Sequence, residues 1–190
     1  MASNIGAYIK NARTKHTVGT VTGFQNFRTF TNGAKVSETN GVDNFCLVEM
    51  VYVDGIPTVK YATSSATAEN TFLTVTPEAV LESYGEKLCD FYNGKDELAN
   101  IAYLPKGFTF ETSNCAASTG VALEVGKFVV WDATNKKFVT KAKSSGSGES
   151  TTYSNALETT DVKGFQIIGI EDDERYNIDG LTLIELAVVR

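Results

Sequence analysis

Four consecutive acids, Glu171, Asp172, Asp173 and Glu174, form the densest group of side chains that could bind a metal ion. Calcium prefers clustered carboxylate oxygens, so a calcium site is one interpretation of this run. The spacing differs from an EF-hand loop, whose ligands alternate around a central glycine. The other interpretations are a solvated turn after the apolar segment 167–170, and an acidic docking surface for a basic partner such as a neighbouring copy of the chain.

Residues for nucleophilic or acid–base catalysis are sparse. Catalysis needs a positioned acid, base or nucleophile. His16 is the only histidine and lies beside Lys15 in a basic stretch, so we interpret it as one more surface charge. The sequence contains neither Gly-x-Ser-x-Gly nor Gly-x-x-x-x-Gly-Lys-Ser/Thr, the motifs of serine hydrolases and of phosphate-binding loops. We therefore expect a protein without enzymatic activity.

The three cysteines, Cys46, Cys89 and Cys115, are widely spaced and form no Cys-x-x-Cys motif. A structural zinc site needs about four ligands, which one histidine and scattered cysteines do not supply. The cysteines are therefore predicted to be small buried side chains in a reducing compartment. We expect no cofactor and no metal centre built on them.

Positive charge is concentrated at the N-terminus. The chain has a net charge of −6, and residues 1–37 carry +5 without a single acid, which leaves −11 on the rest. Such asymmetry indicates that the two parts face different surroundings. We call residues 1–39 the N-terminal arm and expect it to be extended. Its basic residues are Lys10, Arg13, Lys15, Arg28 and Lys35.

Aromatic residues of the arm are candidates for binding contacts. Phe24, Phe27 and Phe30 recur every third residue among polar ones, and aromatic residues are enriched at binding hot spots. One interpretation is that they cover the protein's own core, and the other is that they dock on a partner. Five cations over more than thirty residues are sparse for nucleic acid, and the acidic remainder would repel it. We therefore expect a protein partner.

Residues 45–62 predict a β-hairpin. A long apolar, β-branched run over 45–53 is followed by Asp54-Gly55 and by a second run over 56–62. Strand, Asp-Gly, strand is the strongest short-range signal for a hairpin. Pro57 has no N–H for a sheet hydrogen bond, so it predicts that the second strand lies at an edge or starts after it.

Residues 76–93 predict one helix. Thr76 can cap its N-terminus, Pro77 suits the first helical position, and Asn93-Gly94 supplies a stop. Its apolar residues at helical spacing are Val80, Tyr84, Leu88 and Phe91. This stripe is expected to pack on the core.

Short strands separated by turns are predicted beyond residue 104. Residues 142–152 are rich in Ser and Gly, which is typical of a flexible loop. The predicted strands lie at 106–111, 125–132, 138–140, 164–170 and 181–189. Such a pattern indicates a small β-barrel or β-sandwich. The expected fold is mainly β with one or two helices (α+β), divided into the arm, a hairpin-plus-helix part at 40–104 and a β-rich domain at 105–190.

Apolar runs are too short for a membrane span, and the N-terminus lacks the apolar core of a secretory signal. A soluble protein made in a cytoplasm, with no membrane partner, is the expectation.

The C-terminal part resembles the accessory head proteins of tailed bacteriophages, the decoration or cement proteins. The resemblance covers about 105–190 and rests on short β segments separated by glycines. These are Lys106-Gly107-Phe108, the run from Val125-Gly126-Lys127 to Trp131-Asp132, the run from Lys163-Gly164-Phe165 to Glu171-Asp172, and the closing segment 182–189.

The resemblance implies a non-enzymatic virion protein that binds the major capsid protein, and neighbouring copies of itself, on the capsid surface and stabilises the head. The capsid contacts would then come from Lys10, Arg13, Lys15, Phe24, Phe27, Arg28, Phe30 and Lys35 of the arm. Such a protein would be made in the host bacterial cytoplasm.

Two other functions remain open. One is a different structural subunit of the same particle, a major capsid or tail-tube protein, which also uses extended arms and strands. The other is a module that binds carbohydrate or a cell surface, with Trp131 as a stacking platform and Asp132 as its polar partner. A buried strand residue is the alternative interpretation of Trp131.

Overall fold

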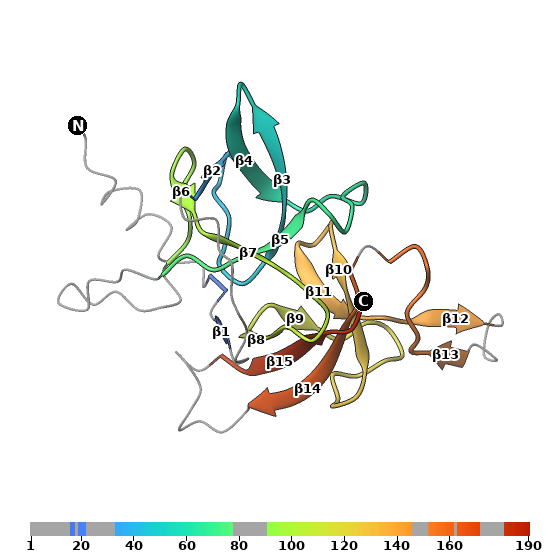
Figure 1. Cartoon of the computed structure of the whole chain (residues 1–190). Coiled ribbons are helices and arrows are strands. Elements are labelled where there is room, and N and C mark those ends of the chain that lie inside the picture. The colour runs from blue at the N-terminus through green and yellow to red at the C-terminus, as the bar shows by residue number, and fades with distance from the viewer. Residues whose placement is uncertain are drawn as a thin grey trace.

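The computed structural model describes residues 16–17, 19–21, 33–77, 91–145, 152–161, 163–171 and 181–190. All regular structure in these ranges is β, in two large sheets and one separate hairpin (Figure 1). The prediction of a mainly β fold is therefore confirmed. Within the same ranges there is no helix, and so none long and apolar enough to cross a membrane.

The six-stranded sheet is built around the predicted hairpin. Its order is β6 (Leu98–Ala99), β2 (Ala34–Val36), β4 (Ile56–Tyr61), β3 (Leu47–Val53), β5 (Thr71–Thr74) and β7 (Ile101–Tyr103). Strands β3 and β4 pair antiparallel around Asp54-Gly55, whose φ angles are 49° and 77°. Positive φ at both central residues is the requirement of the tight hairpin turn that Asp-Gly favours, so the hairpin prediction is confirmed.

Pro57 lies inside β4, and β4 is an interior strand, so the edge prediction was wrong for the strand as a whole. The edge prediction does hold for Pro57 itself, because β2 pairs only with Thr58 and Val59 of β4. Ala62 donates to the Leu47 carbonyl, and the alternation of an antiparallel pair then turns the backbone groups of Pro57 away from β3. The missing N–H of Pro57 therefore faces the β2 side, just before the residues at which β2 pairs with β4.

The seven-stranded sheet holds the strands predicted beyond residue 104. Its order is β1 (Gly19–Val21), β8 (Thr109–Thr112), β15 (Leu183–Val188), β14 (Phe165–Glu171), β10 (Phe128–Asp132), β11 (Lys137–Thr140) and β9 (Cys115–Ala116). Its two outer strands do not pair with each other, so the described strands form no closed barrel. Of the two predicted arrangements, a barrel or a sandwich, the described strands form a sandwich-like arrangement of two sheets.

Two segments of the N-terminal arm are strands of different sheets. β1 pairs with β8 of the seven-stranded sheet, whereas β2 pairs with β4 and β6 of the other. At Gly19 a Cβ atom would lie 2.1 Å from the Glu111 carbonyl oxygen and 2.7 Å from the Phe45 ring. Only glycine fits this approach of β1 to the body.

One hydrophobic core joins the two sheets. Leu47, Leu73 and Leu104 of the first part pack with Phe110 and Phe165 of the second. The Phe110 ring lies edge-on to Phe165 with ring centres 5.9 Å apart, a favourable aromatic arrangement. A second, smaller cluster lies within the six-stranded sheet and includes Val36, Val48 and Val59.

Two predicted segments are only partly described. The helix predicted over 76–93 falls largely on 78–90, which lie outside the described residues. In the predicted Ser/Gly loop, β12 (Lys143–Ser145) pairs antiparallel with β13 (Thr152–Ser154), and 146–151 lie outside the described residues. The described ends of this loop thus form a hairpin, to the right of the body in Figure 1.

Candidate functional site

Of the eight residues predicted for capsid contact, the structure describes Lys35. It lies on β2, and its amine contacts the Asp96 carboxylate at 2.9 Å. This hydrogen bond and charge hold the pKa of Asp96 below its usual value. Both side chains are well exposed, so the pair adds little to stability. The other seven residues, Lys10, Arg13, Lys15, Phe24, Phe27, Arg28 and Phe30, lie outside the described residues.

Of the acidic run, Glu171 is described and is the last residue of β14. The negative charges of Glu171 on β14 and Glu185 on β15 affect the carboxyl group of Glu111 on β8. Burial first, and then these two charges, raise the pKa of Glu111. Asp172, Asp173 and Glu174 lie outside the described residues. Within the part of the chain that the structure describes, no three His, Cys, Asp or Glu side chains meet in a group that could hold a metal ion.

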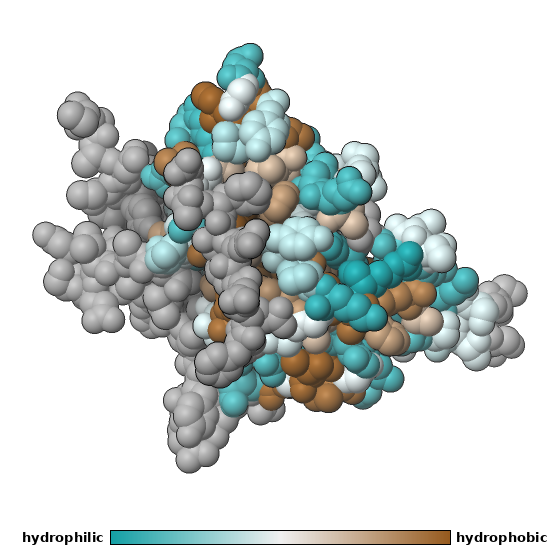
Figure 2. Space-filling model, viewed as in Figure 1, coloured by the Kyte–Doolittle hydropathy of each residue, from teal (hydrophilic) through white to brown (hydrophobic). Residues whose placement is uncertain are grey.

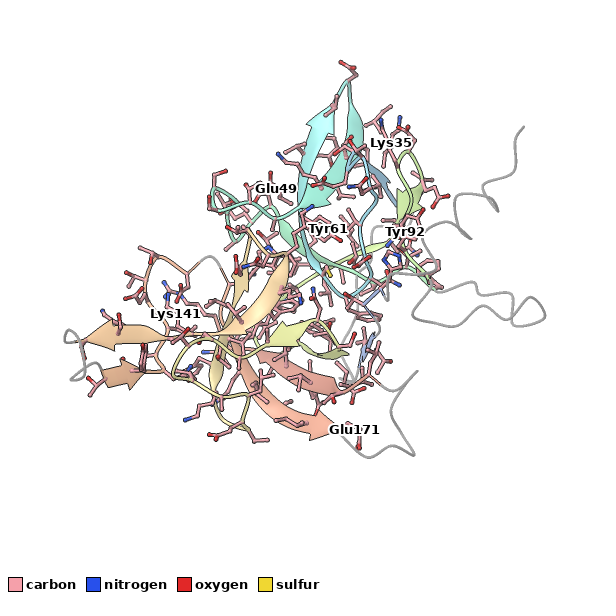
Figure 3. The ribbon with its side chains drawn as sticks, turned by 180° about the vertical axis from the view of Figure 1, so that it is seen from behind. Lys35, Glu49, Tyr61, Tyr92, Lys141 and Glu171 are labelled. Carbon is pink, nitrogen blue, oxygen red and sulfur yellow. The ribbon has the colours of Figure 1, made fainter. Side chains whose placement is uncertain are left out.

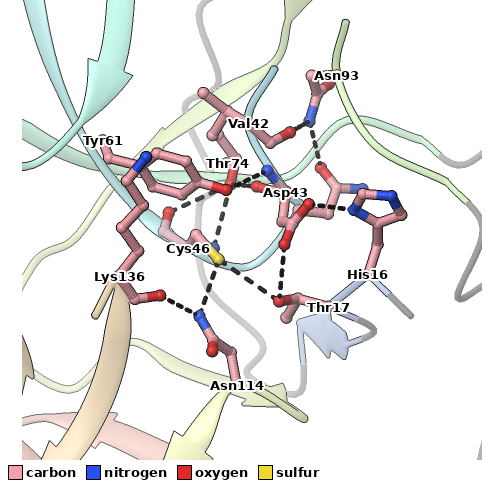
Figure 4. Close-up of polar contacts among 11 residues, drawn as sticks. His16, Thr17, Val42, Asp43, Cys46, Tyr61, Thr74, Asn93, Asn114 and Lys136 are labelled. Carbon is pink, nitrogen blue, oxygen red and sulfur yellow. Dashed lines mark hydrogen bonds and ion pairs between the residues drawn. The ribbon is translucent and has the colours of Figure 1, made fainter. Parts of the chain in front are cut away.

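His16 is largely buried, so its interpretation as a surface charge was wrong. Its Nδ1 lies 2.6 Å from Asp43 Oδ1, and its side chain is 14% exposed. Its ring stacks on Tyr92 with centres 4.8 Å apart. Sequence reasoning missed this contact because Asp43 is far along the chain and no local pattern joins the two. The pair fixes the arm to the loop before β3 (Figure 4).

A polar network continues from this pair into both sheets (Figure 4). Cys46 Sγ lies 3.6 Å from Thr17 Oγ1 and accepts a hydrogen bond from Asn114 Nδ2 at 3.1 Å. Burial, followed by the charge of Asp43, raises the pKa of the Cys46 thiol. A protonated, buried thiol is a poor nucleophile, so we expect no catalytic role for Cys46. Its hydrogen bonds instead help to hold the two sheets together.

The described cysteines make no disulfide. Cys46 is buried and Cys115 is half-buried, and burial raises the pKa of Cys115 as well. Cys89 lies outside the described residues.

The outer end of the β3–β4 hairpin carries a group of exposed apolar side chains. We call this group the hairpin tip, and its members, 40–66% exposed, are Val51, Tyr52, Val53 and Ile56. Figure 2 shows brown and pale side chains there, below the hydrophilic turn at the top of the molecule. A hairpin in water normally alternates apolar and polar residues, and exposed apolar clusters often mark interaction sites. The tip is the best candidate for a functional surface.

The base of the hairpin is held rigidly. Glu49 is 7% exposed and contacts Lys60 Nζ at 3.0 Å. Its other carboxylate oxygen accepts hydrogen bonds from the Thr63 N–H at 3.1 Å and the Thr63 hydroxyl at 2.8 Å. Burial raises the pKa of Glu49, but the hydrogen bonds from Lys60 and Thr63 outweigh it and hold the pKa below its ordinary value. The tip is therefore presented on an anchored support (Figure 3).

The apolar character of the hairpin tip could have been recognised from the sequence. The apolar run over 45–53 stays apolar on both faces up to the turn, although a hairpin needs only one apolar face to pack on its own core. The inner half of β3 is buried and the outer half is exposed.

Trp131 lies between the sheets rather than on an open surface. Its Nε1 donates to the Ala62 carbonyl at 2.9 Å, and its ring packs edge-on against Phe138. Asp132 accepts hydrogen bonds from the Thr134 and Asn135 N–H groups of the next turn, so it does not act as the predicted free polar partner.

Comparison with known proteins places the sequence among phage proteins. The model of a family described as YonC prophage protein matches residues 12–188. The SPbeta prophage-derived uncharacterized protein YonC of Bacillus subtilis (strain 168) is 31% identical over 179 residues, which is 92% of this chain and 91% of that protein. Both matches support the phage origin that the resemblance implied.

Proposed function

The chain belongs to the YonC prophage protein family, and on this premise we propose that it is a non-enzymatic structural protein of a phage particle that binds the major capsid protein and stabilises the head. The observation that carries the proposal is the hairpin tip, an apolar surface held clear of the body on a rigid base.

The tip is suited to insertion into an apolar depression of a partner. Fully burying one aliphatic or aromatic side chain contributes roughly 1.5–3 kcal/mol, so completing the burial of half-exposed ones contributes about 1 kcal/mol each. The tip adds such side chains at no cost of ordering a loop, because Glu49 already fixes the base.

Side chains rather than backbone pairing would make this contact. Pro57 removes the N–H that an added strand would need on the β4 side. On the β3 side, Met50 N already donates to the Asn70 carbonyl, which leaves Tyr52 as the residue of the tip that could pair. Such a short, interrupted edge disfavours strand addition.

The charge distribution fits attachment to an acidic protein surface. Residues 1–37 of the arm carry +5 against −11 on the rest of the chain, and charge complementarity guides association and fixes orientation. The His16–Asp43 contact attaches the arm to the body at the residue that directly follows the basic sequence with Lys10, Arg13 and Lys15.

Co-sedimentation with empty heads of the encoding phage tests the proposal. Replacing two tip residues, Tyr52→Ser with Ile56→Ser, removes about 2 kcal/mol of contact and should weaken binding at least tenfold. The matched control is Leu98→Ser, because Leu98 is equally exposed on β6 of the same sheet but outside the tip. Both variants should keep the parent's unfolding temperature within a few degrees. Undiminished sedimentation of the tip variant would contradict the proposal.

A tail-tube or major capsid subunit is the second candidate, since the same tip could insert into another copy of the chain. The purified protein would then form concentration-dependent oligomers that the tip variant abolishes, whereas a decoration protein needs the shell for its tip contact. Analytical ultracentrifugation of parent and tip variant without heads separates the two.

A further inference from the structure

A pocket of about 380 Å³ opens between the two sheets at Trp131. One wall is the segment after β4, including Ala62, Thr63 and Ser64, and the other is the end of β10 with the turn that follows. Its volume is at the lower end of small-molecule sites, which span roughly 300–1,000 Å³. In Figure 3 this region lies between the labelled Glu49 and Lys141.

Trp131 gives the pocket a fixed aromatic wall. Its N–H is bonded to the Ala62 carbonyl at 2.9 Å, and Phe138 supports its ring from the side with centres 5.1 Å apart. The Tyr61 ring stacks on the indole with centres 6.3 Å apart. Tyr61 and Phe138 do not line the pocket, so these contacts hold the ring in place without filling the space beside it. The face of an aromatic ring is electron-rich and attracts the slightly positive C–H groups of a ligand.

Charged groups of the pocket are already balanced. Lys141 Nζ lies 2.7 Å from Asp161 Oδ1 and 3.1 Å from Glu158 Oε2, and the Lys141 and Asp161 side chains are 16% and 10% exposed. Lys163 directs its amine to the Leu104 carbonyl at 3.0 Å. Asp132 is engaged by the following turn. With two lysines against two aspartates, the lining carries no excess charge that would select an anion or a cation.

The uncharged polar side chains that line the pocket all carry hydroxyl groups. Thr71 is fully buried with its hydroxyl on the Thr67 carbonyl, and the Thr63 hydroxyl contacts Glu49 and the Ser65 hydroxyl. The exposed hydroxyl side chains that line the pocket are Ser64, Thr134 and Thr160. A hydroxyl both donates and accepts, so these groups match a ligand that itself carries many hydroxyls.

From the fixed indole, the balanced charges and the hydroxyl-lined walls, we infer that this pocket binds a neutral saccharide unit, with a C–H face of the sugar ring against Trp131 and its hydroxyls on the threonine and serine side chains. The site is separate from the hairpin tip, so the inference stands independently of binding to the head.

Trp131 is the only tryptophan of the chain, so its fluorescence reports on the pocket directly. The full-length protein is titrated with glucose, galactose, N-acetylglucosamine, their methyl glycosides, maltose and lactose, and with glucose 6-phosphate and glucuronate as charged probes. We expect a saturable emission change with at least one neutral sugar. Tighter binding of a methyl glycoside or disaccharide than of the free hexose would assign the end of a glycan as the ligand, and the reverse order a free sugar.

A pair of neighbouring substitutions provides the control. Ser64→Tyr fills the pocket, whereas Ala68 lies in the same exposed segment and does not line the pocket. Sugar affinity should fall at least tenfold in Ser64→Tyr and stay within twofold in Ala68→Tyr, while both keep the parent's unfolding temperature. Absence of a saturable response to every neutral sugar, a response to the charged probes alone, or equal affinity in Ser64→Tyr would overturn the inference.

Discussion

The two hairpins that leave the body differ in what they expose to the same solvent. Beside the Asp54-Gly55 turn, the exposed residues of β3–β4 are apolar. The described residues of β12 and β13 expose lysine, serine and threonine and one half-exposed aromatic, Tyr153. In their described residues, β12 and β13 therefore form a pair of exposed strands that are mainly polar. The apolar tip of β3–β4 is therefore better explained by a partner than by folding.

The hairpins also differ in how they are attached. A buried carboxylate, Glu49, holds the base of β3–β4. At β12–β13 an exposed contact between the Ser145 and Thr152 hydroxyls at 2.8 Å joins the strands, and the Tyr153 ring lies against Gly120. A surface that must bind as a rigid body benefits from the first kind of support, because less flexibility is lost on binding.

The largest expected effect comes from removing the buried support. Glu49→Ala leaves the Thr63 N–H without its acceptor, and losing hydrogen bonds to a buried charged group costs about 2–3 kcal/mol. Urea unfolding should show this loss, while Glu69→Ala, at an exposed site, should stay within about 0.5 kcal/mol of the parent. An equal stability of both variants would mean that β3–β4 is attached no more firmly than β12–β13.

A smaller effect separates two glycines with similar backbone angles. Gly55 in the β3–β4 turn has φ +77° and open space within 4 Å of the point where a Cβ atom would lie, whereas at Gly120, with φ +80°, a Cβ would lie 2.2 Å from the Tyr153 ring. Alanine at either site costs about 1–2 kcal/mol in a left-handed conformation. Gly120→Ala should lose more in thermal unfolding, since it also displaces Tyr153. Equal losses would show that Tyr153 does not fasten β12–β13.

The smallest effect is the pH dependence of the β3–β4 base. The folded-state pKa of Glu49 lies below its ordinary value of 4.5, so its contribution to stability is present above about pH 4.5 and is lost as the pH falls through the lower, folded value. In Glu49→Gln this contribution is absent at every pH. The difference in Tm between parent and variant should therefore be constant near neutral pH and shrink below pH 4.5. A Tm difference between parent and Glu49→Gln that grows on acidification would show that the folded-state pKa of Glu49 is not lowered.

Local signals in the sequence predicted the elements and missed how they combine. The β3–β4 hairpin followed from Asp54-Gly55 because two adjacent residues specify the turn. The placement of β1 against β8 depends on Gly19 approaching Phe45 and Glu111, which lie far along the chain. Register between distant strands is set by the whole core and leaves no short motif.

The candidate site was predicted less well than the fold for the same reason. His16 has one polar partner, Asp43, that only the folded chain brings near. Trp131 was recognised as a possible aromatic platform, but Asp132, its neighbour in sequence, turns to the following loop. The apolar pattern of the 45–53 run already contained the hairpin tip, but the aromatic residues of the arm were predicted to make the binding contacts instead.

The position of β15 within its sheet has a consequence for biosynthesis. β15 lies between β8 and β14 and pairs with both, yet it is the last described strand in the sequence. The six-stranded sheet consists of residues 34–103 and can pair as the ribosome delivers them. The other sheet lacks a central strand until residues 183–188 have been translated, so a nascent chain that already contains Phe110 and Phe165 cannot yet bury them against β15. A chain truncated before β15 should expose apolar core residues and aggregate, and chaperone binding to the nascent chain should persist until β15 has left the ribosome.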